Sequence, residues 1–489
     1  MPEGREFAIP IKALLQADNI EYLPSGAVQG RRGTTKLNSS ALAGAGNSLW
    51  RHYPRTGSAT TLVGVTDGSN TDFSNASGTS GTFSAASGGS NIPGTKFWFT
   101  NWPAKEKSYL ASLTSGLYYY NGSAIAAVSP DADNEITLGN LGPYLIQHKG
   151  RLWVTATNEL SYSIYPSEVG FDNKFLADSQ ISANDNQGGL ITGLGSFFDY
   201  LLIFKSSCIK RFVGDVSTFN NVALQHVTDV GAIAPRSIAA TPWGYIYVGR
   251  EGVYITDGTQ PNPDELSYPI RSLFVNRTGS TQYPNAVGRW YPIKKQYVLK
   301  LDPSHAYAYV LTRVELLEEN PLIGQRVRVA WLWSYHSKWA MNDGVSWDSE
   351  SDDGRLIGVD DNGFVRTYDT GSTDDGDSFT STIQTASRVV DGSGRTGRAM
   401  RVKCLHRASG TLSGVLRYDQ STSDDVPFTL GDSTLSEKWQ RTYIGDKSKL
   451  GRFVSVKLSR AGDHSNFEVH LIDLDMRLRA PRVWRARNA

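Results

Sequence analysis

The chain of 489 residues has few of the side chains that build metal sites or disulfide frameworks: two cysteines, four methionines and eight histidines. Cys208 and Cys404 lie far apart and show no CxxC spacing. The histidines include neither an HExxH nor an HxH pair. We therefore expect no bound metal and no other cofactor, and reduced thiols in an intracellular environment.

The common signatures of catalysis are also absent. The sequence contains no GxSxG elbow and no phosphate-binding GxxxxGK followed by Ser or Thr. The nearest approach to a sialidase Asp box, Ser346, Trp347 and Asp348 in "VSWDSESDDG", lacks the glycine and the terminal tryptophan and occurs once. The sequence therefore predicts a protein that is not an enzyme and has no catalytic residues.

Long apolar runs and a strong net charge are missing as well. No stretch approaches the roughly 20 apolar residues that span a bilayer, and the amino terminus lacks the apolar core of a signal peptide. Basic and acidic residues number 49 and 48, which leaves a formal charge of +1. No global field favours nucleic acid or a membrane, and we expect synthesis in the cytoplasm.

What the chain does contain favours strands and turns: 48 glycines, 23 tyrosines, 12 tryptophans and only 20% charged residues. Seven hairpin-like stretches recur, each with an apolar strand, a turn and a second alternating strand. They start at Leu62, Leu110, Leu152, Leu201, Tyr245, Tyr297 and Leu356, which are 42 to 59 residues apart. A four-stranded propeller blade needs about 40 to 50 residues.

The repeat predicts an all-β fold with an irregular β-propeller of about five to seven blades over residues 46–372. A single twisted sheet covers neither of its faces, whereas blades in a ring cover one another. The apolar first strand of each hairpin is therefore expected to be the inner one. A long β-protein with hairpins at irregular intervals is the alternative interpretation.

Turn signals punctuate the predicted blades. Asp67-Gly68, Asn121-Gly122, Asp257-Gly258 and Asn362-Gly363 are pairs that supply the positive φ of tight turns. Residues 68–94 are rich in Gly, Ser, Thr and Asn and are predicted to form a long exposed loop, which either stays solvated or is ordered by a partner.

The two ends of the chain differ from the repeat. Residues 1–45 are expected to be extended, and "GRRGTTKLN" near Gly30 is a candidate strand for closing the propeller. A solvated linker containing Asp374, Asp375 and Asp377 is predicted over Gly371 to Ser378. Residues 379–480 have the short alternating strands of a β-sandwich-like domain, and 481–489 form a basic tail.

Three clusters invite a binding interpretation, each with a simpler alternative. Asp352-Asp353 and "STDDGDS" could bind calcium or be solvated turns. Trp331, Trp333 and Trp339 could stack on sugars or fill a core. Five arginines near the carboxyl end could contact DNA phosphates or an acidic partner, or only solubilise the terminus: Arg477, Arg479, Arg482, Arg485 and Arg487.

Residues 189–258 resemble a known group of proteins. The stretch contains "LLIFK", then "IKRFVGD", then "DVGAIAPRSIA" with Gly231, Pro235 and Arg236, and finally "EGVY" before "DG". The segment "NIEYLPSGAVQGRRGTTKLN", with Arg32-Gly33, is similar to the opening of the same group. This order resembles the tail nozzle, tail tubular protein B and packaged-DNA stabilisation group of short-tailed bacteriophages.

The resemblance implies a virion structural protein located in the virion tail. It implies a homo-oligomeric ring, a hexamer in such proteins, below the portal and adaptor, next to tail fibres or tailspikes. Such a ring extends the channel for double-stranded DNA without sequence specificity, retains the packaged genome and passes it at ejection. The alternatives are a propeller glycosidase or lyase acting on host surface polysaccharide, and a glycan-binding attachment protein.

Overall fold

The chain folds into two compact units that are built almost entirely from strands, so the predicted all-β class is confirmed. Unit 1 comprises residues 1–34, 310–338 and 369–489, and unit 2 comprises 35–309 and 339–368. The computed structural model describes residues 5–9, 14–23, 26–156, 163–183, 188–214, 223–276, 279–320, 324–347, 354–390, 396–431, 438–444, 449–461 and 467–478.

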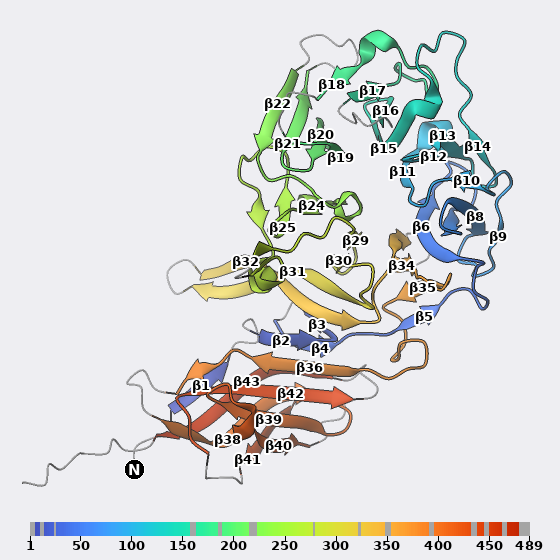
Figure 1. Ribbon diagram of the computed structural model, residues 1–489. Helices are drawn as coiled ribbons and strands as arrows, with labels where there is room; N and C mark the ends of the chain where they lie inside the picture. Colours follow the sequence, from blue (N-terminus) through green and yellow to red (C-terminus); the bar gives the residue numbers. More distant parts are fainter. Residues whose placement is uncertain are drawn as a thin grey trace, which may run out of the picture. The chain divides into compact units, whose positions relative to one another are not determined.

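Seven small antiparallel sheets follow one another around a common centre in the described part of unit 2 (Figure 1). The first sheet contains β6 (Ala45–His52), β7 (Thr60–Thr66), β8 (Asn70–Ser77), β9 (Ser84–Ala85) and β10 (Ile92–Pro93), and the second contains β11 (Trp98–Trp102), β12 (Lys107–Ser112), β13 (Gly116–Tyr120) and β14 (Ile125–Ala127). The third contains β15 (Leu141–His148), β16 (Arg151–Ala156), β17 (Ser163–Pro166) and β18 (Ile181–Ser182), and the fourth contains β19 (Ile191–Phe197), β20 (Tyr200–Lys205), β21 (Ile209–Val213) and β22 (Ala223–Thr228). The fifth contains β23 (Ala239–Thr241), β24 (Gly244–Val248), β25 (Val253–Thr256) and β26 (Asp264–Glu265).

The last two sheets are less regular. The sixth contains β29 (Val287–Tyr291), β30 (Gln296–Lys300) and the start of β31 (Tyr307–Asn320), of which residues up to Tyr309 belong to unit 2. The seventh contains β33 (Asp343–Trp347), β34 (Arg355–Val359), β35 (Val365–Tyr368) and, from the N-terminal segment, β5 (Thr34–Lys36).

Apolar side chains join neighbouring sheets into a ring. Separate clusters fill the spaces between the first and second, second and third, third and fourth, fourth and fifth, and seventh and first sheets. The first strand of the sixth sheet, β29, contacts β23 and β33 of its two neighbours. Each sheet therefore buries both faces against adjacent sheets, which is the packing of a propeller.

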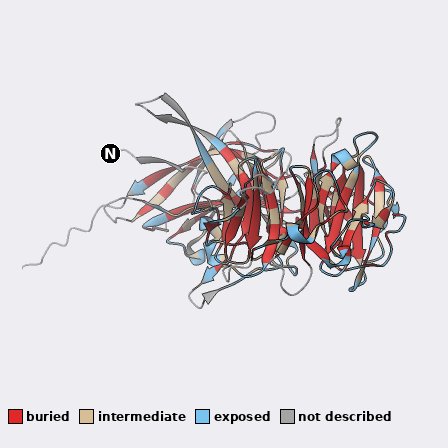
Figure 2. Ribbon diagram, turned by 90° about the horizontal axis from the view of Figure 1, so that it is seen from above, coloured by how far each residue is buried: buried red, intermediate tan, exposed pale blue. Residues whose placement is uncertain are grey.

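The position of the most apolar strand differs from the prediction. All seven predicted hairpin starts lie in the second strand of a sheet, and these strands are buried almost throughout, as in β7, β16 and β24. Figure 2 shows that the buried residues lie mainly in strands. The second strand has a strand on each side and a sheet over each face. The innermost strand of each sheet instead borders the centre of the ring, so some of its side chains stay accessible to solvent.

The prediction of a long loop over residues 68–94 is wrong, because this segment supplies β8, β9 and β10 of the first sheet. Phe73, Ala86 and Ile92 are buried and pack in one cluster with Leu110 of the next sheet. A few apolar residues at these spacings are enough to fix short strands despite the glycine and serine content.

The four predicted turn pairs lie in turns between strands. Gly68, Gly122, Gly258 and Gly363 have φ values of 109°, 97°, 79° and 74°, in the region that favours glycine. In the first of these turns, Asp67 Oδ1 accepts hydrogen bonds from the backbone N–H groups of Ser69 and Asn70, both at 2.9 Å.

Unit 1 is a sandwich of two sheets. One contains β1 (Arg5–Ile9), β3 (Ile20–Tyr22), β4 (Val28–Gly30), β38 (Gly397–Arg407), β41 (Lys438–Tyr443) and β43 (Glu468–Leu478). The unit 1 strands of the other are β31 from Val310 onward, β32 (Gly324–Ser337), β2 (Leu14–Asp18), β36 (Thr380–Thr385), β37 (Arg388–Val389), β39 (Leu412–Tyr418), β40 (Val426–Leu430) and β42 (Phe453–Ala461). One apolar cluster contains residues from both sheets, including the free, buried Cys404.

The composition of the units differs from the predicted boundaries. Residues 1–34 and 310–338 belong to the sandwich unit, although 1–45 was expected to be a separate extended segment and 310–338 to be part of a propeller. The reason is long-range pairing: β2 pairs antiparallel with β36 and parallel with β32. No local pattern in the sequence specifies partners more than 300 residues away.

Candidate functional sites

The C-terminal arginines are only partly described by the structure. Arg477 is exposed on β43, where its backbone lies in register with Arg398 of β38. It is thus a strand residue of the sandwich. The other four, Arg479, Arg482, Arg485 and Arg487, lie outside the described residues.

A buried carboxylate joins four sheets at the centre of unit 2. Asp343 begins β33 of the seventh sheet and is 1% exposed. Its Oδ2 accepts hydrogen bonds from the backbone N–H of Leu49 at 2.9 Å and from Nη2 of Arg236 at 2.8 Å. Its Oδ1 accepts from Nε of Arg289 at 2.9 Å and also from Nη2 of that residue. We call Asp343, Arg236 and Arg289 the central ion cluster.

The two arginines reach this carboxylate from different sheets. Arg236 lies in a short 3-10 helix, Pro235–Ser237, just before β23 of the fifth sheet, and Arg289 lies on β29 of the sixth. Arg236 Nη2 also donates to the backbone oxygen of Asn47 in the first sheet at 2.7 Å. Arg289 Nη1 donates to the backbone oxygen of Arg236 at 2.7 Å. The cluster therefore links the fifth, sixth, seventh and first sheets.

Positive charge exceeds negative charge in the central ion cluster, because two guanidinium groups face one carboxylate. Arg236 is 8% exposed, and its Nε has no hydrogen-bond partner among the described residues. Burial lowers the pKa of Arg236 from its ordinary value, and the charge of Asp343 opposes that shift. Lys96 lies outside this cluster; desolvation and then the charge of Arg236 lower its pKa.

A cavity of about 400 Å³ adjoins the central ion cluster, and residues of all seven sheets line it. Aromatic rings form a large part of its wall: Trp50, Trp98, Phe99, Tyr144, Tyr245 and Trp290. Trp50 and Phe99 stack with ring centroids 5.3 Å apart and planes 10° apart. Trp50, Trp98, Phe99 and Trp290 are only half-buried, so parts of these side chains remain accessible to solvent.

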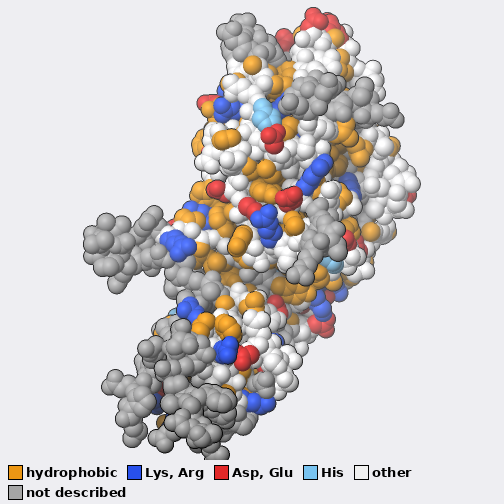
Figure 3. All heavy atoms as spheres, turned by 60° about the vertical axis from the view of Figure 1, so that its left-hand side comes forward, with side chains coloured by type: hydrophobic (Ala, Val, Ile, Leu, Met, Phe, Trp, Pro, Cys, Tyr) orange, Lys and Arg blue, Asp and Glu red, His pale blue; other side chains and the backbone are white. Residues whose placement is uncertain are grey.

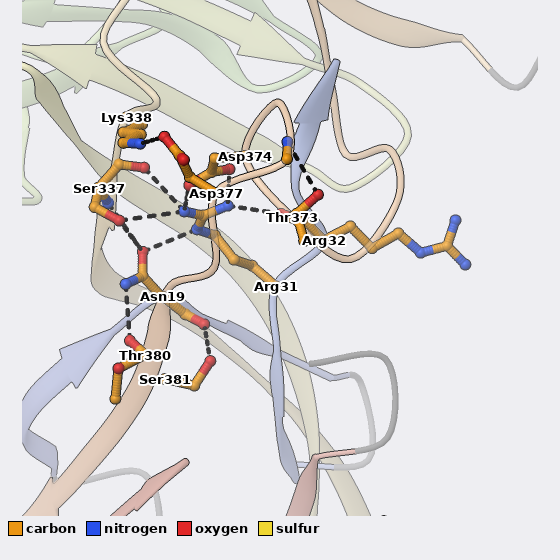
Figure 4. Close-up of polar contacts among 11 residues, drawn as sticks. Asn19, Arg31, Arg32, Ser337, Lys338, Thr373, Asp374, Asp377, Thr380 and Ser381 are labelled. Carbon is orange, nitrogen blue, oxygen red and sulfur yellow. Dashed lines mark hydrogen bonds and ion pairs between the residues drawn. The ribbon is translucent and has the colours of Figure 1, made fainter. Parts of the chain in front are cut away.

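A second buried ion pair lies within unit 1 (Figure 4). Arg31 is fully buried and binds Asp374 through two hydrogen bonds, Nη1 to Oδ1 at 2.9 Å and Nη2 to Oδ2 at 2.6 Å. Its Nε donates to Oδ1 of Asn19 and its Nη2 to the backbone oxygen of Ser337, both at 2.9 Å. Burial lowers the pKa of Arg31, and the hydrogen bonds to Asp374 oppose this.

This pair corrects the predicted solvated linker. Asp374 is 2% exposed, because it is the counter-ion of a buried arginine. The guanidinium of Arg31 also lies over the ring of Phe379, 3.7 Å from its centroid. Asn19 Nδ2 donates to the backbone oxygen of Thr380 at 2.9 Å. Three stretches of unit 1 that are distant in sequence, around residues 19–31, 337 and 373–381, thus meet at one polar node.

The other candidate clusters have structural explanations where they are described. Trp333 and Trp339 are buried and Trp331 is half-buried, which fits core filling better than sugar stacking. Asp377 pairs with Lys338. Asp348, Asp352 and Asp353 lie outside the described residues. Among those that are described, no group of three or more His, Cys, Asp and Glu side chains is placed to hold a metal ion.

Gly231 and Arg236, two residues of the motif that resembles phage tail proteins, have structural roles in unit 2. A Cβ on Gly231 would lie 2.4 Å from the backbone oxygen of Lys205 and equally close to the nitrogens of Ser207 and Cys208, so only glycine fits there. Arg236 binds Asp343. Asp343 and Arg289 could not be paired from sequence alone, because 54 residues separate them and no local motif links them.

Comparisons with known proteins assign no family. No protein-family model matches the chain, and no curated protein matches it by sequence. Among solved structures, YCF48 from Cyanidioschyzon merolae is 11% identical, with a TM-score of 0.39 over 69% of this chain and 98% of that one. An exo-β-1,3-galactanase from Phanerochaete chrysosporium is 9% identical, with a TM-score of 0.27 over 91% and 100%. The extracellular domain of a one-component system from B. thetaiotaomicron is 10% identical, with a TM-score of 0.42 over 86% and 48%.

Proposed function

We propose that this chain is a structural subunit of a short-tailed bacteriophage tail. In this role it forms a ring, a hexamer by the resemblance of residues 189–258, that docks below the adaptor and portal and beside fibres or tailspikes. The ring extends the channel through which double-stranded DNA leaves, and it retains the packaged genome until ejection. The protein acts as a scaffold and not as an enzyme.

The observation that carries this proposal is how often the chain passes between its two units. It crosses at residues 34/35, 309/310, 338/339 and 368/369, so four covalent connections join the sandwich unit to the propeller unit. A single linker would transmit any mechanical load between the units through one segment of backbone. Four connections divide the load, which suits a component that must hold its form against the pressure of packed DNA.

The central cavity supports a scaffold over the alternative of a glycosidase. Glycosidases of the common type place two carboxyl groups on either side of the scissile bond. Among the described residues that line the cavity, Asp343 alone carries a carboxylate. That carboxylate already accepts hydrogen bonds from two arginines, so it has little capacity left to act as a nucleophile or base.

The charge distribution also suits a DNA channel. On the face shown in Figure 3, basic and acidic side chains are interspersed among hydrophobic and uncharged ones. The formal net charge is +1. Since a strongly basic wall would bind phosphates and slow the passage of DNA, a nearly neutral surface favours release.

In the described part of the chain, no helix has the length and apolar character needed to cross a bilayer.

The proposal can be tested by assembly of purified components. We expect the isolated chain to be mainly monomeric in mass photometry at nanomolar concentration and to form a ring on a purified portal and adaptor complex, visible by negative-stain electron microscopy. Failure to associate with that complex would contradict the proposal. A parallel incubation with host surface polysaccharide should release no reducing ends; release would favour the glycosidase alternative.

A further inference from the structure

The central cavity of unit 2 combines features that a purely structural plug does not need. The central ion cluster carries more positive than negative charge, and Arg236, which lines the cavity, has a buried Nε without a hydrogen-bond partner among the described residues. Buried charges are favourable only when they are paired. An anion in the cavity beside the central ion cluster would balance its surplus positive charge.

The volume of the cavity and the side chains that line it indicate which class of anion would fit. A volume of about 400 Å³ lies within the range of small-molecule sites. Half-buried rings from three different sheets, Trp50, Trp98 and Trp290, offer flat apolar surface next to the charge. The planar guanidinium group favours flat, two-oxygen acceptors. The surplus in the central ion cluster is a single charge, which matches a carboxylate better than a doubly charged phosphate.

We propose that this cavity is a binding site for a small organic carboxylate whose body is a single ring. The carboxylate would lie against Arg236 and Arg289, and the ring would stack on the aromatic wall. Two sources share this chemistry: a free aromatic or alicyclic acid, and an acidic sugar unit of a polysaccharide. The proposal does not depend on the role in a phage tail, because its evidence lies in the cavity itself.

Isothermal titration calorimetry with the full chain tests the charge requirement. Benzoate and glucuronate serve as probes for the two sources, and benzamide and glucose serve as their neutral counterparts. We expect at least one acid to bind at least tenfold more tightly than its neutral counterpart. Preference for benzoate indicates a free acid, whereas preference for glucuronate indicates an acidic sugar; either result supports the site.

Two substitutions place the bound acid in the cavity. Ala240 is exposed and lines the cavity without taking part in the central ion cluster, so Ala240→Trp should fill the space and weaken binding at least tenfold. Ala127→Trp, at an exposed position on β14 outside the cavity, is the matched control and should leave affinity unchanged. Arg236→Gln should also weaken binding at least tenfold, with circular dichroism used to confirm folding.

Three results would overturn the proposal. The first is no binding of either acid at concentrations up to about 20 mM, a range that covers weak small ligands. The second is equal affinity for the acid and its neutral counterpart, which would remove the role of charge. The third is undiminished binding to folded Ala240→Trp, which would place the acid elsewhere. If Arg236→Gln does not fold, the Ala240→Trp and Ala127→Trp pair still decides.

Discussion

At the scale of single residues, two buried arginines organise the two units separately. Arg31 joins distant stretches of the sandwich unit through Asp374 and Asn19, and Arg236 joins sheets of the propeller unit through Asp343. A buried charge without its partner is strongly destabilising, whereas an exposed pair contributes little. Removing one partner of a buried ion pair should therefore lower the free energy of unfolding far more than removing one partner of an exposed pair.

We expect Arg31→Met to destabilise unit 1 by about 3–5 kcal/mol, because it leaves the Asp374 carboxylate buried without a counter-ion. The control is Arg417→Met in the same unit. Arg417 also binds its partner Asp425 through two hydrogen bonds, at 2.9 and 2.8 Å, but that pair is partly exposed, so the loss should stay near 1 kcal/mol or less.

Differential scanning calorimetry of both variants checks this prediction. The double variant Arg31→Met with Asp374→Leu should recover part of the loss, since it removes both charges. Equal effects of Arg31→Met and Arg417→Met would contradict the structural role assigned to the buried pair.

His148 makes the stability of unit 2 depend on pH. Burial first, and then the charge of Lys149, lower the pKa of His148 to about 4, and its Nδ1 lies 2.7 Å from Oγ of Ser196. In the unfolded chain the pKa is about 6.5. As the pH falls from about 6.5 to about 4, the unfolded chain takes up a proton that the folded one resists, so stability falls.

His148→Gln should therefore reduce the loss of stability between pH 6.5 and 4.5 by about 2 kcal/mol relative to the unmodified protein. Thermal melting at both pH values measures this difference. His226→Gln, at an exposed position on β22, is the matched control for the effect of the substitution itself. If the stability of His148→Gln changed with pH just as that of the unmodified protein does, this explanation would be wrong.

Residue-scale features could be predicted from the sequence when their chemistry is local. The Asp-Gly and Asn-Gly pairs predicted turns because positive φ is a property of the glycine itself, and Gly68 and Gly258 have it. Asp374 was wrongly expected to be solvated, because its partner Arg31 is 343 residues away. The central ion cluster was missed for the same reason.

At the scale of elements, the repeat could be recognised but the place of its strands could not. Apolar runs such as those of β7 and β20 marked each sheet. They were assigned to the inner position because the interior of a ring was expected to be the most apolar. Around the cavity the innermost strands carry half-buried and charged residues instead, such as Trp50 and Arg289.

The seventh sheet depends on the N-terminal segment for its outermost strand. Besides β5, the side chain of Asn38 attaches this segment to the sheet: its Oδ1 accepts from the backbone N–H of Val365 at 2.8 Å, and its Nδ2 donates to the backbone oxygen of Gly363 at 3.1 Å. Asn38 is buried, with 4% of its surface exposed.

Asn38→Ala should destabilise the seventh sheet by about 1–3 kcal/mol, since it leaves the buried backbone N–H of Val365 without this acceptor, while the Gly363 oxygen still accepts from the backbone N–H of Leu42. Hydrogen exchange of a peptide covering residues 355–368 should become faster, while peptides of the second and third sheets should change little. Asn75→Ala is the control, because Asn75 bonds to Tyr120 and Ser123 outside the seventh sheet. Unchanged exchange over 355–368 would refute the closing role of this segment.

At the scale of the whole molecule, the division into two units could not be read from the sequence. Residues 310–338 follow the repeat without a change in composition, yet β32 pairs with β2 in the sandwich unit. The prediction of a propeller followed by a sandwich had the right architectures, but the chain interleaves the two units instead of completing one before the other. The four passages between units arise from this interleaving.

The basic C-terminal end belongs to this scale because its proposed partners lie outside the chain. Replacing Arg477, Arg479, Arg482, Arg485 and Arg487 by Gln should lower the yield of DNA-filled particles about tenfold or more, through loss of phosphate or acidic-partner contacts. Replacing the same five by Lys keeps the charge and should restore much of the yield. Normal, filled particles from the Gln variant would reject a role for these arginines.

The location of the chain in a virion tests the central claim most directly. Virions made from the genome that encodes this chain would be labelled with a gold-conjugated antibody against it and imaged by electron microscopy. The account predicts label on the tail, below the portal vertex. Label on the capsid, or none on intact or disrupted particles, would contradict it.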